Sequence, residues 1–320
     1  MREQVADVIV VGAGNAAFCA ALAARERGAQ VLVLEAAPEK ESGGNSRFTA
    51  GSIRVAYDGI DDIKTLVPDL TQAEIETTDF GAYTKAQFFD DMARVTQHRA
   101  DPDLVEALVN NSFATLDWMR QSGVRLIPIY GRQAFKVDGR FKFWGGLTVE
   151  SVGGGPGLIA MLTAAASRRG IEVRYRSRAL DLLYDGATVG GVRVRRGGAI
   201  EELRAGAVVL ACGGFEANPE WRTRYLGSGW DLAKVRGSRF NTGDGIRMAL
   251  DIGASPRGNW SGCHAVQWEM NAPEFGDLAV GDQFQKTDVG VALQIRVAGE
   301  PVEMGRLSRV TQDAGRQGHR

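Results

Sequence analysis

The feature that most constrains the fold is a glycine-rich turn near the N-terminus, set between an apolar strand pattern and a helix pattern. Residues 6–11 read ADVIVV, a β-branched run typical of a buried strand. The turn GAGNAA at residues 12–17 follows at once, and alanine-rich sequence continues to Arg27. A strand, a G-x-G-x-x-A turn and a helix in this order are the dinucleotide fingerprint of a βαβ unit.

The second half of this unit favours a nucleotide over a purely structural turn. Gly28 is placed to end the helix, and residues 31–34 (VLVL) read as the second strand. Glu35 closes that strand about 20 residues after Gly14. A carboxylate there can accept hydrogen bonds from both ribose hydroxyls and would repel a 2′-phosphate. The unit therefore predicts an adenine dinucleotide other than NADP, and by itself it leaves FAD and NAD open.

The small residues of the turn each have a mechanical role. Gly12 permits the tight turn, Gly14 lets the backbone approach a pyrophosphate, and Ala17 keeps the helix close to the sheet. The helix N-terminus would then meet the phosphates with free amides and the positive end of its dipole.

Three later segments place glycines and short polar residues at the ends of apolar patterns. Residues 43–51 read GGNSRFTAG, residues 210–215 read LACGGF after a strand pattern at 207–210, and residues 241–245 read NTGDG before a helix pattern at 246–250. Each alone could be a flexible loop or a helix cap. Together and in this order, they resemble the flavoproteins of the fumarate reductase and succinate dehydrogenase family, and the likeness spans about residues 1–286.

The resemblance implies an α/β fold with a Rossmann-like FAD-binding domain of the glutathione reductase type, a β-meander and the start of a capping domain. In the succinate dehydrogenase branch, a histidine in the first loop bonds covalently to the flavin, whereas Asn45 stands there in this chain. Non-covalent FAD is thus implied. The residues expected to hold it are Gly12, Gly14, Asn15, Ala16, Ala17, Glu35, Ala36, Gly43, Gly44, Asn45, Ser46, Gly51, Ala179, Ala211, Cys212, Gly213, Gly214, Thr242, Gly243 and Asp244.

The rest of the chain shows helix and strand patterns around these motifs. Helices are predicted at residues 84–99 and 102–121, and a third between the glycines of residues 153–157 and Gly170. Strands predicted at residues 171–175, 179–184 and 189–194 resemble the family's meander, whose backbone around Ala179 would contact the adenine side. Four residues of the helix predicted at 102–121 are expected in the core at helical spacing: Leu104, Leu108, Leu116 and Met119.

Composition excludes some classes of function. The net charge of −1, with 24% charged residues, gives no sign of a nucleic-acid or acidic-lipid partner. The three cysteines (Cys19, Cys212 and Cys263) lack metal-ligand spacing, so free thiols in a reducing compartment and no metal site are expected. No stretch reaches the roughly 18 apolar residues of a bilayer-spanning helix. We therefore expect a cytoplasmic protein that does not span a membrane.

The candidate catalytic residue is His264. It lies near the place of a substrate-binding histidine in the resembling family, although Ala265 follows it where the family has proline. The alternative is a polar residue at a domain boundary. The family's proton-transferring arginine belongs to a stretch with no counterpart here, and the resemblance ends after Lys286. Our hypothesis is a truncated or frame-disrupted product. Residues 1–258 would form an FAD-binding domain without its C-terminal return segment, residues 259–320 an incomplete capping domain, and residues 287–320 a possible non-native tail.

The narrower resemblance concerns substrate. The middle region and residues 260–268 are most similar to tricarballylate dehydrogenases, FAD enzymes that oxidise a tricarboxylate to cis-aconitate. This implies hydride transfer from a small di- or tricarboxylate to FAD, with a separate iron–sulfur protein as a possible electron acceptor. A soluble fumarate reductase, a flavoprotein of cobalamin-ring synthesis and a catalytically silent FAD-binding fragment remain open. An NAD-dependent dehydrogenase is disfavoured by the segments 43–51 and 241–245 together.

Overall fold

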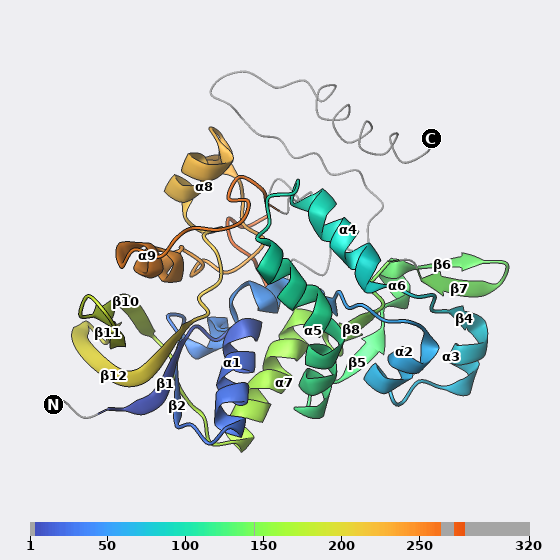
Figure 1. Cartoon of the computed structure of the whole chain (residues 1–320), viewed down its shortest axis with the longest axis horizontal. Coiled ribbons are helices and arrows are strands. Elements are labelled where there is room, and N and C mark those ends of the chain that lie inside the picture. Colours follow the sequence, from blue (N-terminus) through green and yellow to red (C-terminus); the bar gives the residue numbers. More distant parts are fainter. Residues whose placement is uncertain (1–3, 144, 264–271, 279–320) are drawn as a thin grey trace.

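The computed structural model describes residues 4–143, 145–263 and 272–278 (Figure 1). Its largest sheet has six strands in the order β10-β11-β12-β1-β2-β9. These strands are β1 (Ala6–Val11), β2 (Val31–Leu34), β9 (Glu172–Arg174), β10 (Ser177–Tyr184), β11 (Val189–Arg196) and β12 (Ala199–Leu210).

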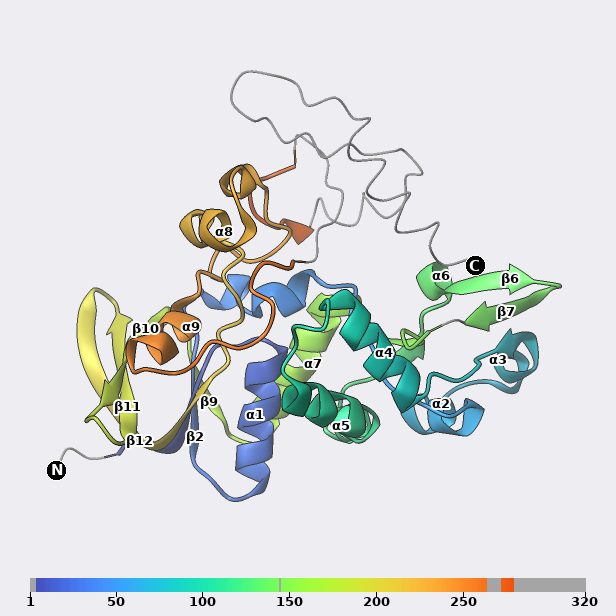
Figure 2. The ribbon, with the colours of Figure 1, turned by 45° about the horizontal axis from the view of Figure 1, so that its top comes forward.

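One half of this sheet is parallel, and its two central strands, β1 and β2, are largely buried on both faces. β12, β1, β2 and β9 run parallel, with Val10 opposite both Val209 and Val33. Val10 and Val33 pack on one face with helices α1 (Asn15–Glu26) and α7 (Gly154–Arg168), which lie side by side in Figure 2. The alternate residues point to the other face, where they pack with the meander. Burial on both faces explains why β1 and β2 read as nearly continuous apolar runs.

The other half is an antiparallel meander of β10, β11 and β12. β12 belongs to both halves: residues 199–204 pair with β11, and residues 205–210 pair with β1. The prediction that residues 171–175 form part of the meander is wrong. Strand β9 instead runs parallel to β2 at the sheet edge, and Arg176, with φ 53°, turns the chain toward β10. The first half of β12 is polar and largely exposed, so the apolar strand pattern did not predict it.

Residues between the first loop and α7 form two small three-stranded sheets with helices around them. The sheets are β3-β8-β5, made of Ser52–Ile53, Val149–Ser151 and Leu126–Pro128, and β4-β7-β6, made of Thr78–Asp79, Arg140–Phe143 and Ala134–Val137. The remaining helices are α2 (Ile60–Leu66), α3 (Gln72–Thr77), α4 (Lys85–Val95), α5 (Pro102–Gln121), α6 (Tyr130–Gln133), α8 (Pro219–Leu226) and α9 (Asp244–Asp251). Three short 3-10 helices are η1 (Glu39–Glu41), η2 (Gly44–Phe48) and η3 (Trp230–Leu232).

Helices α4 and α5 follow the sequence patterns in part. α5 begins at the predicted residue, because Asp101 caps it and Pro102 takes the first helical position. α4 ends at Val95, before the predicted residue 99, since the chain then turns through positive φ angles. The prediction that four residues of α5 lie in the core is confirmed for Leu116 and Met119 and is wrong for Leu104 and Leu108.

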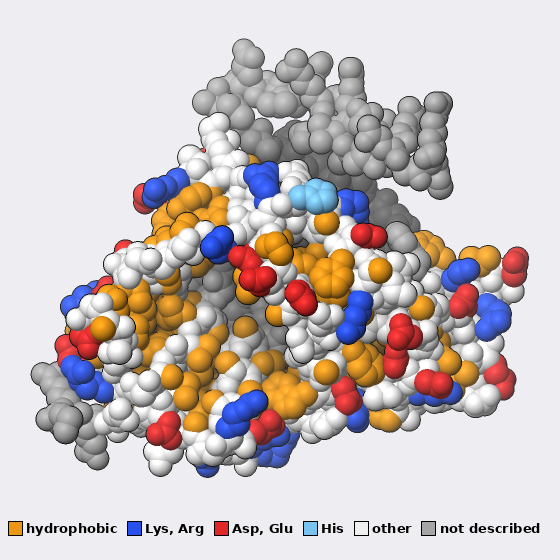
Figure 3. All heavy atoms as spheres, in the orientation of Figure 1, with side chains coloured by type: hydrophobic (Ala, Val, Ile, Leu, Met, Phe, Trp, Pro, Cys, Tyr) orange, Lys and Arg blue, Asp and Glu red, His pale blue; other side chains and the backbone are white. Residues whose placement is uncertain are grey.

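Those two leucines, Leu104 and Leu108, are 65% and 48% exposed. The buried stripe of α5 runs through Val109, Leu116 and Met119 instead, and it leaves the leucines on the outer side of the helix. Charged side chains of both signs are interspersed over the face shown in Figure 3. Within the described ranges, every helix falls short of the length and apolarity that crossing a bilayer requires.

Candidate cofactor-binding site

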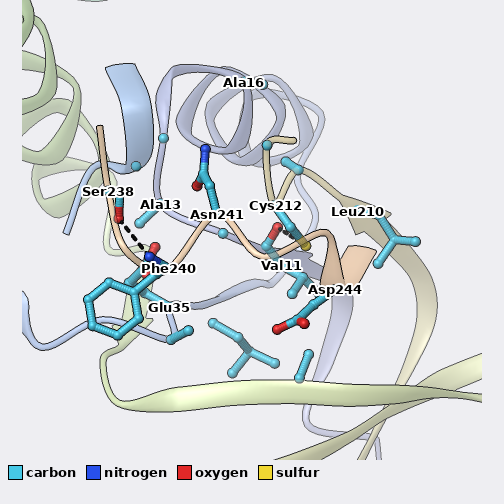
Figure 4. Close-up of a pocket in the computed structure, with 18 of the residues that line it drawn as sticks. Val11, Ala13, Ala16, Glu35, Leu210, Cys212, Ser238, Phe240, Asn241 and Asp244 are labelled. Atoms are coloured by element: carbon cyan, nitrogen blue, oxygen red, sulfur yellow. Dashed lines mark hydrogen bonds between the residues drawn. The ribbon is translucent and has the colours of Figure 1, made fainter. Parts of the chain in front are cut away.

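A pocket of about 340 Å³ collects the ends of elements that are far apart in the sequence (Figure 4). It lies where the parallel strands end, between the β1–α1 turn, η2, the start of β10 and the start of α9. Fourteen of the residues predicted to hold a cofactor line it: Gly12, Gly14, Asn15, Ala16, Glu35, Ala36, Gly44, Asn45, Ser46, Ala179, Ala211, Cys212, Gly213 and Asp244.

The two fingerprint glycines are required for different reasons. Gly12 has φ 114°, and a Cβ there would lie 2.4 Å from the carbonyl oxygen of Ala211 at the end of β12. The protein itself therefore excludes a side chain at this position. Gly14 has φ −83°, which any residue adopts, and a Cβ there would meet nothing nearer than the Ser46 hydroxyl at 3.5 Å. Packing does not explain this glycine, whereas a ligand resting against its backbone does.

The N-terminus of α1 is suited to an anion. Its capping residue Gly14 offers no side-chain cap, and the first turn contains no acidic residue. The amide of Asn15 donates to the Ser46 hydroxyl at 3.1 Å, which ties η2 to the helix start. Asn15 and Ala16 both line the pocket, so the positive end of the helix dipole faces it.

Glu35 is a buried carboxyl group at the pocket wall. It is 7% exposed, and its side chain accepts a hydrogen bond from the Ala37 amide at 2.7 Å. Burial raises the pKa of Glu35 above its usual value, while the amides of Ala37, Ala13 and Ala36 oppose that rise. A group with unused acceptor capacity in a partly desolvated wall fits the ribose hydroxyls of an adenine nucleotide.

The loop after β2 is tied to the segment before α9. The Asn45 side-chain oxygen accepts from the Ser238 amide at 2.8 Å. The glycines around it are constrained: Gly43 and Gly44 have φ 107° and 55°, and a Cβ on Gly51 would lie 2.2 Å from the Ser151 hydroxyl. The loop is therefore a fixed wall of the pocket.

The remaining predicted residues lie beside the pocket. Ala17 is a fully buried residue of α1, and Gly243, with φ 84°, is the capping residue of α9. Six predicted residues do not line the pocket themselves: Ala17, Gly43, Gly51, Gly214, Thr242 and Gly243. His264 lies outside the described residues.

Cys212 contributes a protected thiol to the pocket floor. Its Sγ lies 3.4 Å from the Val11 carbonyl oxygen, to which it donates. Burial, followed by the charges of Asp244 and Glu35, raises the pKa of Cys212 to about 12. The thiol is therefore a packing group at neutral pH and a poor nucleophile.

Sequence reasoning missed ten lining residues: Val11, Ala13, Leu34, Ser177, Arg178, Leu210, Ser238, Phe240, Asn241 and Met248. Most are neighbours of the predicted motifs, so extending each motif by a residue would have found them. Ser238 and Phe240 could be inferred only from the folded chain.

The sequence that forms the pocket matches a known protein family. Residues 7–268 match the FAD binding domain family, which covers every segment that lines the pocket. The chain belongs to this FAD binding domain family. FAD is therefore the cofactor of the domain, and the chemistry of the lining fits it: a buried ribose acceptor, an uncapped helix N-terminus and an open space over Gly14.

Relatives in the FAD binding domain family include reductases. The chain is 31% identical to a probable fumarate reductase of Shewanella frigidimarina, over 79% of this chain and 40% of that protein. It is 29% identical to a urocanate reductase of Eggerthella lenta, over 78% of this chain and 38% of that protein. It superimposes with a TM-score of 0.61 on the open conformation of a flavocytochrome c3 fumarate reductase, at 29% identity, over 79% of this chain and 41% of that one. The chain thus spans about two fifths of each.

Proposed function

We propose that this chain is the FAD-binding part of a flavin-dependent oxidoreductase of the fumarate reductase type and holds FAD without a covalent bond. The observation that carries the proposal is the meeting of four motif segments in one pocket, with Glu35 in its wall and the uncapped N-terminus of α1 beside it. Asn45 supports the non-covalent mode, because it offers a carboxamide that is already bonded to Ser238. The strand order β9-β2-β1-β12 supports the Rossmann-like assignment, since it reproduces a 3-2-1-4 order.

The protein groups in this proposal position and retain the cofactor. Glu35 accepts hydrogen bonds from the ribose hydroxyls, and the first amides of α1 meet the pyrophosphate. The glycines of η2 and of the β12 end keep the backbone close to the cofactor. Bound FAD supplies the two-electron redox chemistry, which no side chain of this chain could perform alone.

For the substrate, we propose a small di- or tricarboxylate, with tricarballylate oxidised to cis-aconitate as the first candidate. The names of the relatives, fumarate reductase and urocanate reductase, support redox chemistry next to a carboxylate. His264 is our proposed substrate-binding residue, within a capping region at residues 259–320 that follows an FAD-binding region at residues 1–258. A separate iron–sulfur protein would accept the electrons. A soluble fumarate reductase, a cobalamin-synthesis flavoprotein and an inactive FAD-binding fragment are the alternatives.

The test is an absorption spectrum of the purified chain under anaerobic conditions. A flavin band that bleaches on addition of tricarballylate supports the proposed dehydrogenase. If only dithionite bleaches the band and fumarate then restores it, the fumarate reductase alternative is favoured. A band that responds to neither substrate supports the inactive fragment. The proposal fails altogether if FAD added to the protein shows no saturable binding. Flavin that is released by acid precipitation supports the non-covalent mode.

A further inference from the structure

An ion pair lines the FAD pocket without belonging to the dinucleotide fingerprint. The guanidinium of Arg178, on β10, donates to both carboxylate oxygens of Asp244 at the start of α9, with Nε at 2.7 Å and Nη2 at 3.0 Å. The same Nη2 donates to the Thr242 hydroxyl at 3.0 Å. One arginine of the meander thus binds both polar side chains of the Thr242–Gly245 motif. The side chains of Arg178 and Asp244 are 46% and 25% exposed, so the pair lies on the solvent side of the pocket.

The charges around the pocket make this arginine unusual. Among the described lining residues, Arg178 is the one cation, and the two carboxylates are Glu35 and Asp244. The pocket therefore presents a net negative lining to a cofactor whose pyrophosphate is itself a dianion. The negative charges of both carboxylates are felt inside the pocket, because they contribute to the raised pKa of Cys212 on the pocket floor.

A second ion pair joins the same two elements away from the pocket. Arg247 of α9 lies 3.5 Å from Asp181 of β10 and also donates to the Leu180 carbonyl oxygen. Neither Arg247 nor Asp181 lines the pocket. The attachment of α9 to the meander does not depend on Arg178 alone, and Arg247 provides a matched comparison for it.

We propose that Arg178 is the counter-charge of the FAD site: it neutralises Asp244 so that the pocket can accept and retain the anionic cofactor. This inference rests on the proposed FAD site and adds a residue outside its fingerprint. Without Arg178, the Asp244 carboxylate stands unpaired at the pocket and repels the pyrophosphate. With Arg178 in place, the bidentate pair offsets most of the negative charge of Asp244 toward the phosphates, while the uncapped N-terminus of α1 attracts them.

The decisive experiment is a double-mutant cycle on FAD affinity, with Kd measured by quenching of flavin fluorescence on the full chain. Arg178→Met should weaken FAD binding about tenfold when Asp244 is present. In the Asp244→Asn background, the same change should cost less than about twofold, because no carboxylate remains to be neutralised. An equal cost in both backgrounds overturns the proposal, since Arg178 would then act on FAD directly or through the fold.

Two further variants separate charge from structure. Arg178→Lys keeps the charge and loses the bidentate geometry, so FAD affinity should stay within about threefold of wild type; a loss as large as that of Arg178→Met overturns the inference. Arg247→Met should lower the stability of the FAD-free protein by about as much as Arg178→Met while leaving the Kd unchanged. An equal loss of FAD affinity in both methionine variants also overturns it. If the wild-type chain does not bind FAD, the proposed function itself fails. This result is distinguishable from every outcome of the cycle, because the cycle compares variants of a chain that binds FAD.

Discussion

The side-chain oxygen of Asn45 accepts a hydrogen bond from the backbone amide of Ser238 at 2.8 Å, which joins the loop after β2 to the segment before α9. The residue before Ser238 is also close to this oxygen, because a Cβ on Gly237 would lie 2.3 Å from it. Asn45 is thus part of the pocket wall and is held by the protein.

Asn45→Ala should therefore affect both stability and cofactor binding. Removing the Asn45 side-chain oxygen leaves the Ser238 amide without this hydrogen-bond acceptor, which should lower the free energy of unfolding by about 1–2 kcal/mol. The loosened wall should also weaken FAD binding. Urea denaturation of the FAD-free protein and a flavin titration measure the two effects. Asn111→Ala, on the exposed side of α5, is the matched control, and equal changes in both variants would contradict the role given to Asn45.

The two fingerprint glycines should respond oppositely to alanine. Gly12→Ala forces a side chain to φ 114° and against the Ala211 carbonyl oxygen, so the FAD-free protein should lose on the order of 2–4 kcal/mol of stability. Gly14→Ala has room for its Cβ and should leave that stability unchanged or raise it by less than about 1 kcal/mol. Its FAD affinity should nevertheless fall at least about tenfold. Thermal unfolding and flavin titration of both variants test this, and tight FAD binding by Gly14→Ala would refute it.

Glu35 should give the FAD-free protein a pH-dependent stability. Burial raises its pKa in the folded state, so the folded chain binds this proton more tightly than the unfolded chain does. The free energy of unfolding should therefore fall as pH rises from the ordinary carboxyl pKa through the raised one. Ribose hydroxyls favour the ionised group, so FAD affinity should rise over the same interval. Glu35→Gln should remove both dependences, and pH profiles identical to wild type would show that Glu35 causes neither.

The three thiols should differ in reactivity. Burial raises the pKa of Cys19 to about 11 and, with two nearby carboxylates, that of Cys212 to about 12. Cys263 is exposed, so iodoacetamide near pH 8 should modify it first. Peptide mapping by mass spectrometry gives the three rates. FAD should slow the modification of Cys212 further because this residue lines the pocket, and a Cys212 rate equal to that of Cys263 in the FAD-free protein would disprove the assignment.

Local sequence patterns alone are enough to predict the first βαβ unit and the positions of its neighbouring motifs. Residues 6–11 and 31–34 form the predicted strands, and the glycine turn and Glu35 both line the pocket. Such features are readable because apolar runs, positive-φ glycines and helix ends are set by interactions within a few residues. The cap at Asp101 and the buried Leu116 and Met119 follow from the same local rules.

Contacts between residues that are distant in the sequence become known only from the folded chain. Arg178 and Asp244 are 66 residues apart, and nothing in either local pattern specifies their ion pair. The assignment of β9 to the parallel sheet and the exposure of Leu104 and Leu108 likewise depend on how whole elements pack. The physical reason is that periodicity specifies how a segment folds and which of its faces is apolar. Strand order, and with it the partner of a half-exposed charge, depends on long-range contacts that form only when the whole sheet assembles.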